Sequence, residues 1–329
     1  MPSIKDVARE AGVSPATVSL VLNDKGSISE ETRQRVLDTV RRLRYVRNSR
    51  ASNLRKDQSR IIGYAQRHDR TGINPLMDLF LHELVREVEK SNRHILLFAS
   101  REDLGVAVYQ DLYESKKVDG FVLSYTEKDD QRFGYLYAEE VPFVAFGRSL
   151  SELDDLVCWA DVDGHAGLFA ATNHLLDQGH RKIGLIGWPK GSASGDSRVQ
   201  GWRAALQAYE LPCSEDYVER TLDSVDCGYE AAQHLCIRFG DLEALACCSD
   251  SLALGALKFI TENQLRIAVT GFDDTPVAGF VGLTSVRQPV KEVAHLLVRM
   301  LFTQLQGYEV EEKQRLFIPE LIVRNSTQF

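Results

Sequence analysis

The chain has 329 residues, of which 44% are apolar and 26% charged, and its formal net charge is −8. This length exceeds what one hydrophobic core usually serves, so two or three domains are expected. No apolar run approaches the roughly 20 residues of a membrane helix, and the first residues lack a signal-peptide pattern, so we expect a cytoplasmic protein with no membrane segment.

Charge is divided unevenly along the chain. Residues 1–60 hold 13 Lys and Arg against 7 Asp and Glu, whereas residues 61–329 hold 26 against 40. A small basic segment joined to a large acidic body suggests that the first segment alone binds nucleic acid. The alternative is that its basic residues form an ordinary solvated helical face.

Helix signals begin close to the N-terminus. Apolar residues at helical spacing predict a first helix over 4–11, which Gly12 would end in a left-handed conformation. Ser14 and Pro15 are the residue types that favour a helix start. They predict a second helix that continues over 16–22.

A turn at 23–26 separates this helix from a third, which Ser29 would cap. Two short helices joined by a tight turn and followed by a third predict a helix-turn-helix arrangement, whose second helix enters the major groove of DNA. The outward side chains of the second helix would be Pro15, Ala16, Thr17, Ser19 and Leu20.

A known family signature resembles residues 4–19, which read IKDVAREAGVSPATVS. The resemblance is to the headpiece of the lactose-repressor/galactose-repressor (LacI/GalR) family of bacterial transcription regulators, and it continues through 29–33 and 45–48. Leu20 stands where the family usually has an Arg that reads a guanine, and Arg47 stands where it usually has Pro. With the position of the second helix, the resemblance implies DNA contacts by Ser14, Pro15, Ala16, Thr17, Ser19, Leu20, Ser29, Asn48, Ala51 and Leu54.

Residues 48–56, which read NSRASNLRK, would form a helix of about two turns that is marginal alone in water. In the family, the matching segment is a hinge helix that orders on operator DNA, pairs with its twin in a homodimer and inserts a leucine into the minor groove. Leu54 matches that leucine, and such a wedge unstacks a base step and kinks the duplex. The alternative is that Leu54 packs within a linker.

Apolar strands alternate with helices from Ile61 onward. Continuous apolar strands between helices are typical of parallel sheets buried on both faces, and two such sets predict two doubly wound lobes. The predicted strands cover 61–65, 94–99, 120–124, 142–146, 183–187, 244–248 and 267–271. The predicted helices cover 74–91, 105–115, 164–178, 197–209, 228–239 and 251–263.

Ligands of such sheets bind at the carboxyl ends of the strands. The loops there contain Asp, Arg, Gln and Trp, which suit a polyhydroxyl ligand because charged groups bind hydroxyls and an aromatic ring covers the apolar face of a sugar. The resemblance extends to this body, which looks like a two-lobed periplasmic sugar-binding protein. It maps an inducer-contacting arginine onto Arg198 and a hydroxyl-binding carboxylate onto Asp273, and it places Ser249 where the family usually has Asn. The predicted effector contacts are Asn74, Asp78, Arg148, Arg198, Trp202, Ser249, Asp250, Asp273 and Gln288.

Enzyme and metal motifs are weak in this sequence. The glycine-rich run 187–195 lacks the order of a P-loop, since Lys190 precedes Gly191, and we expect it to form a loop of the ligand cleft. The eight histidines show no metal spacing and the six cysteines no CxxC pair, so no metal, cofactor or catalytic residue is predicted. The acidic pairs at 154–155 and 161/163 are interpreted as solvated or capping groups.

These observations predict an α/β chain of three parts. A helix-turn-helix headpiece covers 1–46, a hinge helix and linker cover 47–60, and a two-lobed periplasmic-binding-protein-like core of doubly wound parallel sheets covers 61–329. The first lobe would span about 61–160 and 290–317, and the second about 162–288 and 318–329.

The predicted function is that of a sequence-specific DNA-binding transcriptional regulator that acts as a repressor. It would bind double-stranded operator DNA as a homodimer and respond to a sugar or glycoside bound between the two lobes. One alternative is a regulator that responds to a purine, a sugar phosphate or a partner protein. Another is a sugar-binding or sugar-modifying protein whose basic segment is incidental.

Overall fold

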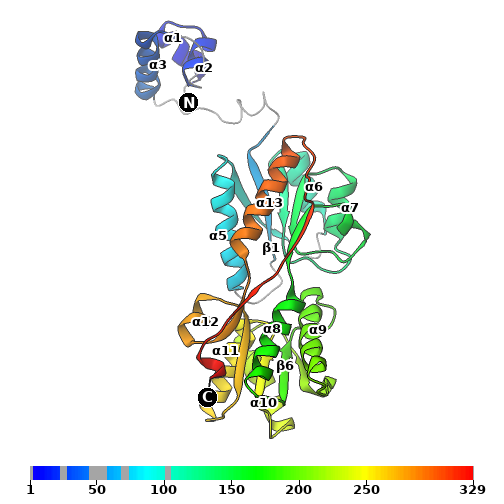
Figure 1. Ribbon diagram of the computed structural model, residues 1–329. Helices are drawn as coiled ribbons and strands as arrows, with labels where there is room; N and C mark the ends of the chain where they lie inside the picture. The colour runs from blue at the N-terminus through cyan, green and yellow to red at the C-terminus, as the bar shows by residue number, and fades with distance from the viewer. Residues whose placement is uncertain (1–2, 23–27, 44–57, 68–73, 101–104, 329) are drawn as a thin grey trace. The chain divides into compact units, whose positions relative to one another are not determined.

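The computed structural model describes residues 3–22, 28–43, 58–67, 74–100 and 105–328. The chain divides into two compact units, Met1–Ser59 and Arg60–Phe329 (Figure 1). The predicted turn at 23–26 and the predicted DNA contacts Asn48, Ala51 and Leu54 lie outside the described residues. Among the residues that are described, no helix is both long enough and apolar enough to cross a membrane.

The first unit contains the three predicted helices, α1 (Ile4–Ala11), α2 (Pro15–Leu22) and α3 (Glu30–Arg42). Gly12 ends α1 in the left-handed conformation, with a φ of 65°. Ser14 and Ser29 start the next two helices, because their hydroxyl oxygens accept hydrogen bonds from the backbone N–H groups of Thr17 and Thr32. The apolar faces of the helices share a small core of Val7, Ala8, Ala11, Val18, Val21 and Val36. The helix-turn-helix prediction is confirmed.

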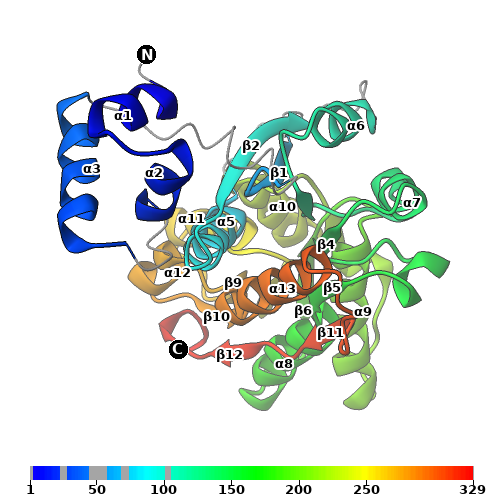
Figure 2. The same ribbon diagram turned by 90° about the horizontal axis from the view of Figure 1, so that it is seen from above.

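The first lobe of the second unit is a parallel sheet with helices on both faces. Its strands lie in the order β11-β5-β4-β3-β1-β2. They are β1 (Ile61–Arg67), β2 (His94–Ser100), β3 (Gly120–Leu123), β4 (Phe143–Phe146), β5 (Trp159–Val162) and β11 (Gln314–Phe317). Helices α5 (Pro75–Glu89) and α13 (Val290–Leu305) cover one face side by side, and α6 (Ala107–Glu114) and α7 (Gln131–Ala138) cover the other (Figures 1 and 2).

The second lobe repeats this plan with the strand order β12-β10-β9-β8-β6-β7, in which only β12 is antiparallel to its neighbour among the described strands. Its strands are β6 (Ile183–Gly187), β7 (Val218–Arg220), β8 (Ala244–Cys247), β9 (Ala268–Asp273), β10 (Thr284–Arg287) and β12 (Glu320–Ile322). Its helices are α8 (Gly164–Asp177), α9 (Ala193–Ala208), α10 (Val225–Arg238), α11 (Asp250–Glu262) and α12 (Pro276–Val281). Short 3₁₀ turns lie at Glu152–Asp155, Glu215–Tyr217 and Asn325–Thr327.

Three described connections join the lobes. Asp163 links β5 to α8, residues 288–289 link β10 to α13, and residues 318–319 link β11 to β12. Two of these connections are tied together, since the backbone N–H of Asp163 donates to the carbonyl of Phe317 over 2.8 Å. Each connection leaves its sheet at the carboxyl end of a strand, so the ends where parallel sheets bind ligands lie at the junction of the lobes.

The predicted alternation of strands and helices is confirmed in both lobes, but α9 begins earlier than expected. Ser192 caps this helix by accepting a hydrogen bond from the N–H of Gly195 over 3.3 Å. The prediction that the whole run 187–195 forms a cleft loop is therefore wrong, because Ala193, Ser194 and Gly195 form the first turn of α9. A serine N-cap signal lies inside the glycine-rich run and competes with the loop interpretation.

Glycines let the helices of the second lobe pack backbone against backbone. A Cβ placed on Gly201 of α9 would lie 2.2 Å from the carbonyl oxygen of His165 in α8. A Cβ on Gly255 of α11 would lie 2.0 Å from the carbonyl oxygen of Val225 in α10. Real Cβ atoms do not approach oxygen so closely, so only glycine permits these helix pairs to approach as they do.

Gly255→Ala should therefore destabilise the core by about 1–3 kcal/mol, the usual range for overpacking, even though alanine favours helices. Thermal or urea unfolding of the full chain measures the loss. Gly240→Ala is the matched control, because nothing lies within 4 Å of a Cβ at that position. Equal stability of the two variants would contradict the close approach of α10 and α11.

Candidate functional site

Arg198 is the centre of a polar cluster at the carboxyl ends of the second-lobe strands. It lies on α9 with only 5% of its surface exposed. Its Nη1 donates to the carbonyl oxygen of Cys248, just after β8, and lies 3.9 Å from Oδ1 of Asp273 at the end of β9. The ring centroids of Phe272 and Trp188 lie 3.7 Å and 4.6 Å from its Cζ. In the described structure, Nε of Arg198 and Nε1 of Trp188 are buried without a hydrogen-bond partner, so two donors remain unused.

Asp273 is a buried carboxylate beside this arginine. Its Oδ1 accepts a hydrogen bond from Nε2 of Gln288 over 2.7 Å. Burial raises the pKa of Asp273 well above its usual range, and the charges of Asp250 and Asp223 raise it further, whereas Arg198 lowers it. Three residues predicted as effector contacts, Arg198, Asp273 and Gln288, thus lie together.

The backbone after β9 holds an unusual turn. Asp273 has a φ of 115° and Asp274 a φ of 49°, values that residues with side chains rarely adopt. Conformations of this kind cost on the order of 1–3 kcal/mol each and persist where the surrounding structure holds them. Here Asp274 accepts hydrogen bonds from Arg287 over 2.7 Å and from Arg324 over 2.5 Å. These ion pairs hold the turn that aims Asp273 at Arg198.

The first lobe contributes a second ion pair to the same region. Nε of Arg148, which follows β4, lies 3.1 Å from Oδ2 of Asp161 in β5, and its Cζ lies 5.4 Å from the ring centroid of Trp159. Burial raises the pKa of Asp161, while the charges of Arg148 and Arg198 lower it. The charge of Arg198, in the second lobe, therefore acts on the carboxylate of Asp161 in the first lobe. A Cβ on Gly164 would lie 3.0 Å from Cγ of Arg198, so Arg198 packs closely against the first residue of α8.

Asn74 and Asp78 lie at the start of α5, on the first lobe. Oδ1 of Asn74 accepts a hydrogen bond from the N–H of Met77 over 3.2 Å and so caps the helix. Asp78 is exposed, and its charge adds to burial in raising the pKa of Tyr64 on β1. Among their described contacts, none joins Asn74 or Asp78 to the Arg198 cluster, although both were predicted as effector contacts with it.

Ser249 and Asp250 are both buried at the start of α11. Oγ of Ser249 accepts a hydrogen bond from the N–H of Leu252 over 3.2 Å and caps the helix. Oδ1 of Asp250 accepts from Oγ of Ser285 over 2.6 Å, and its Oδ2 accepts from the N–H of Thr275 over 2.7 Å. Asp250 therefore joins α11 to β10 and to the start of α12, and its expected role as an effector contact stays a prediction.

The structure changes the expected list in two further ways. Trp202 is fully buried in the hydrophobic core of the second lobe, whereas Trp188 is the indole that flanks Arg198. Trp202 lies in the segment 196–202 around Arg198, and residue type alone does not distinguish an indole in the core from an indole in the cleft. Asp161 and Asp223 act on the cluster but are not among the predicted contacts, and the sequence pattern indicates only a solvated or capping role for Asp161. The signal that could have found both is their place at or after the end of a parallel strand.

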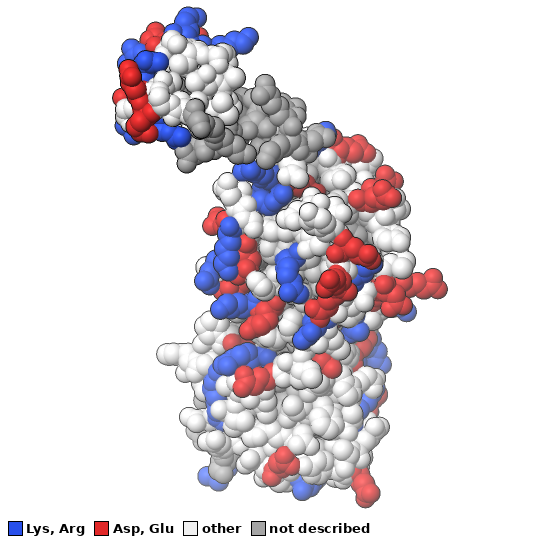
Figure 3. Space-filling view, turned by 45° about the horizontal axis from the view of Figure 1, so that its top comes forward, with Lys and Arg blue, Asp and Glu red and all other residues white. Residues whose placement is uncertain are grey.

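The DNA-facing surface expected of the headpiece is the outer face of α2. Pro15, Ala16 and Leu20 are exposed there, while Thr17 and Ser19 are half-buried. The exposed fraction of Leu20 is 41%. Figure 3 shows both basic and acidic side chains on the face of the headpiece in view. Some of the arginines are paired within the unit, as when Nη2 of Arg42 donates to Glu10 over 2.8 Å.

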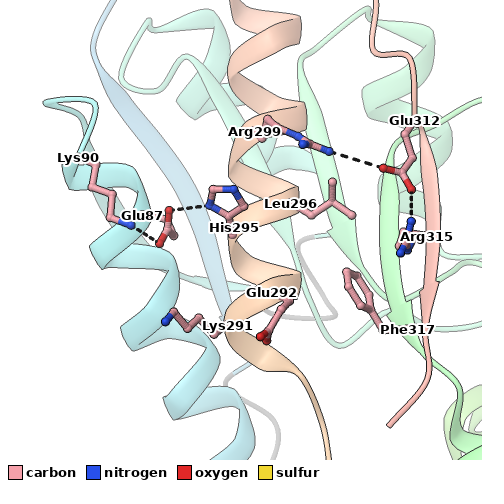
Figure 4. A pocket seen from close by; sticks show the side chains of 10 residues that line it. All are labelled: Glu87, Lys90, Lys291, Glu292, His295, Leu296, Arg299, Glu312, Arg315 and Phe317. Atoms are coloured by element: carbon pink, nitrogen blue, oxygen red, sulfur yellow. Dashed lines mark hydrogen bonds and ion pairs between the residues drawn. The ribbon is translucent and has the colours of Figure 1, made fainter.

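A groove of about 400 Å³ lies away from the Arg198 cluster, between α5, α13 and β11 (Figure 4). Its charges largely pair with one another. Glu87 binds both Lys90 and Nδ1 of His295, and Glu312 binds both Arg299 and Arg315. The groove is therefore lined mostly by paired charges, together with Lys291 and Glu292.

Two family models match the chain. Residues 3–48 match the model described as bacterial regulatory proteins, lacI family, and residues 172–327 match a periplasmic binding protein-like domain. Two curated relatives match over nearly the whole length. They are the transcriptional regulator CelR of Thermobifida fusca, 28% identical over 99% of this chain and 98% of its own, and the transcriptional repressor PurR of Mannheimia succiniciproducens, 28% identical over 100% and 99%.

Solved structures agree with these matches. A LacI-family regulatory protein from Chloroflexus aggregans is 36% identical, with a TM-score of 0.76, over 82% of this chain and 98% of its own. The lac repressor dimer bound to operator and the anti-inducer ONPF is 26% identical, with a TM-score of 0.85, over 99% of both chains. A complex of CelR with cellobiose is 27% identical, with a TM-score of 0.76, over 99% of this chain and 100% of its own.

The chain belongs to the LacI family of bacterial regulatory proteins. It is accordingly a DNA-binding transcriptional regulator controlled by an effector, and not an enzyme. The helix-turn-helix unit and the two-lobed core are the two parts that this class of protein combines.

The buried carboxylates predict a pH dependence of stability. Burial raises the pKa of Asp250 to about 6, above the value of about 3.9 in an unfolded chain. The folded state therefore binds a proton more tightly, so Asp250 lowers the free energy of unfolding progressively as pH rises from about 4 to 6, by about 2–3 kcal/mol in all. The stability of Asp250→Asn relative to wild type should rise by about this amount between pH 4 and 7. Urea unfolding across this pH range measures the difference, and Asp226→Asn, at an exposed aspartate, is the control. If the free energies of unfolding of Asp250→Asn and wild type change with pH in parallel, the pKa of Asp250 is not raised.

Proposed function

We propose that this regulator responds to a sugar or glycoside bound at the junction of the lobes, between the Arg198 cluster and the Arg148–Asp161 pair. The observation that carries the proposal is the buried Arg198, which has Asp273 and two aromatic rings beside it and an unused Nε donor. The cellobiose complex of CelR, a structural relative over nearly the whole chain, supports a saccharide as the class of effector.

The chemistry of the cluster suits vicinal hydroxyl groups. The carboxylates of Asp273 and Asp161 accept hydrogen bonds, while the guanidinium groups of Arg198 and Arg148 donate them. The ring of Trp188 offers an apolar surface to one face of a pyranose. Gln288, Ser249 and Asp250 belong to the same proposal as supporting groups, and Asn74 and Asp78 as contacts made from the first lobe.

For the headpiece we infer that α2 enters the major groove, with contacts from Ser14, Pro15, Ala16, Thr17, Ser19 and Leu20 and with Ser29 at a phosphate. Asn48, Ala51 and Leu54 belong to the proposed hinge helix. The lac repressor dimer on operator supports a homodimer as the binding form. Effector-driven movement of the lobes would then alter the spacing of the two headpieces, on nucleoid DNA in the bacterial cytoplasm.

Arg198→Ala should abolish the effect of the saccharide while the chain still binds operator. A ligand of the folded core raises its melting temperature by mass action, so the variant should lose this rise entirely. A thermal-shift screen against sugars and glycosides, followed by operator titration, measures both properties. Arg203→Ala is the matched control on the same helix, since Arg203 pairs with Glu215, which is not among the residues of the cluster. An unchanged saccharide response in Arg198→Ala would exclude the proposed site.

Leu20→Arg should change the operator that the headpiece selects. An arginine that binds a guanine edge contributes roughly 1–3 kcal/mol of discrimination, whereas the exposed Leu20 offers only apolar contact. Binding-site selection from random duplexes measures the preference. Gln34→Arg on α3 adds the same charge away from α2 and should leave the consensus unchanged. If Leu20→Arg also leaves the consensus sequence unchanged, position 20 of α2 does not contact the bases of the operator.

A further inference from the structure

Asp223 lies beside the Arg198 cluster, next to Ser249. It follows β7 and precedes α10, and its side chain is half-buried. Its Oδ1 accepts a hydrogen bond from Oγ of Ser249 over 2.5 Å. The charge of Asp223 also raises the pKa of Asp273 and of the Cys248 thiol. Asp223 therefore acts electrostatically on two residues that surround Arg198.

Ser249 has no donor left for a ligand. Its single O–H donates to Asp223, and its oxygen accepts from the N–H of Leu252 at the start of α11. Ser249 is also 99% buried, with an exposed fraction of 1%. An asparagine, which this family usually has at the position, would present an amide with both donors and an acceptor. With serine in place, the polar group that remains available on this side of the cluster is the carboxylate of Asp223.

The balance of charge around Arg198 is negative. The charge of Arg220, which adjoins the cluster, is compensated by Asp196, because its Nη1 donates to Asp196 over 2.8 Å as well as to the carbonyl of Trp188 over 2.9 Å. Arg198 lies beside Asp273, and Arg148 beside Asp161. Within the part of the chain that the structure describes, neither Asp223 nor the buried Asp250 has a Lys or Arg within 4 Å, and Asp223 is the more exposed of these two uncompensated carboxylates.

We propose that Asp223, held by Ser249, determines the specificity of the effector site: it accepts a hydrogen bond from a hydroxyl or amino group of the ligand and repels phosphate and carboxylate groups. The effector is then a neutral or amino saccharide, and sugar phosphates and sugar acids are excluded. This inference rests on the proposed function of the site. A charged acceptor makes a stronger hydrogen bond than a neutral one and opposes any second negative charge placed near it.

The test uses the full chain and saccharides that share a ring but differ in charge. The neutral and amino panel contains glucose, cellobiose, glucosamine and chitobiose. The anionic panel contains glucose 6-phosphate, glucuronate and cellobionate. Both belong to a broader screen of mono- and disaccharides of the same charge classes. Thermal shift identifies binders, and calorimetry gives their affinities for wild type, Asp223→Asn and Asp223→Ala. The exposed Asp226→Asn, three residues along the chain, is the matched control for loss of one charge. The melting temperature without ligand and the affinity for operator show that each variant is folded.

We expect only neutral or amino saccharides to stabilise the wild type. Asp223→Ala should weaken the best of them roughly ten- to a hundredfold, the usual effect of removing a hydrogen bond to a charged group. Asp223→Asn keeps the shape of the side chain and an acceptor oxygen. It should lower the ratio of neutral-saccharide affinity to anionic-saccharide affinity by tenfold or more. Asp226→Asn should change neither the affinity for the best neutral saccharide nor this ratio. The inference is overturned if an anionic saccharide stabilises the wild type as strongly as a neutral one, or if Asp223→Asn leaves that preference unchanged.

Failure of the inference and failure of the proposed function give different results. If a neutral saccharide binds in a way that depends on Arg198 but not on Asp223, the site stands and the specificity role of Asp223 falls. If no saccharide of either charge stabilises the wild type, the saccharide function itself fails and the inference fails with it.

Discussion

The guanidinium group of Arg198 is a permanent charge inside the second lobe, and an unpaired charge in such a place would cost several kcal/mol. Its partners come from the carboxyl ends of three neighbouring strands: Trp188 after β6, Cys248 after β8, and Phe272 with Asp273 at the end of β9. The strand order of the second sheet therefore decides what surrounds the charge. The strained turn at Asp273 persists because Arg287 and Arg324 hold the next residue.

The same group links the two lobes. Arg198 lies against Gly164, the first residue of the helix that begins the second lobe, and its charge acts on Asp161 at the end of the first-lobe sheet. A ligand that inserts hydroxyl groups between these charges would replace direct electrostatic coupling with hydrogen bonds from both lobes. The position of one lobe relative to the other would then depend on whether the effector site is occupied. The pair of lobes would be the two-state element that control of DNA binding requires.

Local chemistry made much of the fold predictable. Ser14, Pro15 and Ser29 mark helix starts by their own side chains, and buried apolar strands between helices define parallel sheets without further information. Arg198 and Asp273 were identified by resemblance, because their motifs are continuous in sequence. Asp161 and Asp223 could not be identified in this way, since their proximity to Arg198 follows from strand order and from the crossing of the chain between lobes. Trp202 was misplaced because an indole has the same pattern in a core as beside a ligand.

Control of DNA binding by an effector requires that operator and effector act on one conformational equilibrium of the full chain. The most direct measurement is the affinity of a stabilising saccharide for the chain alone and for the chain saturated with its selected operator. Because coupling between sites is reciprocal, the two affinities should differ by the same factor by which the saccharide changes operator affinity, a factor of roughly 5 to 150 in typical cases. Equal saccharide affinity on and off the operator would show that the two sites are not coupled.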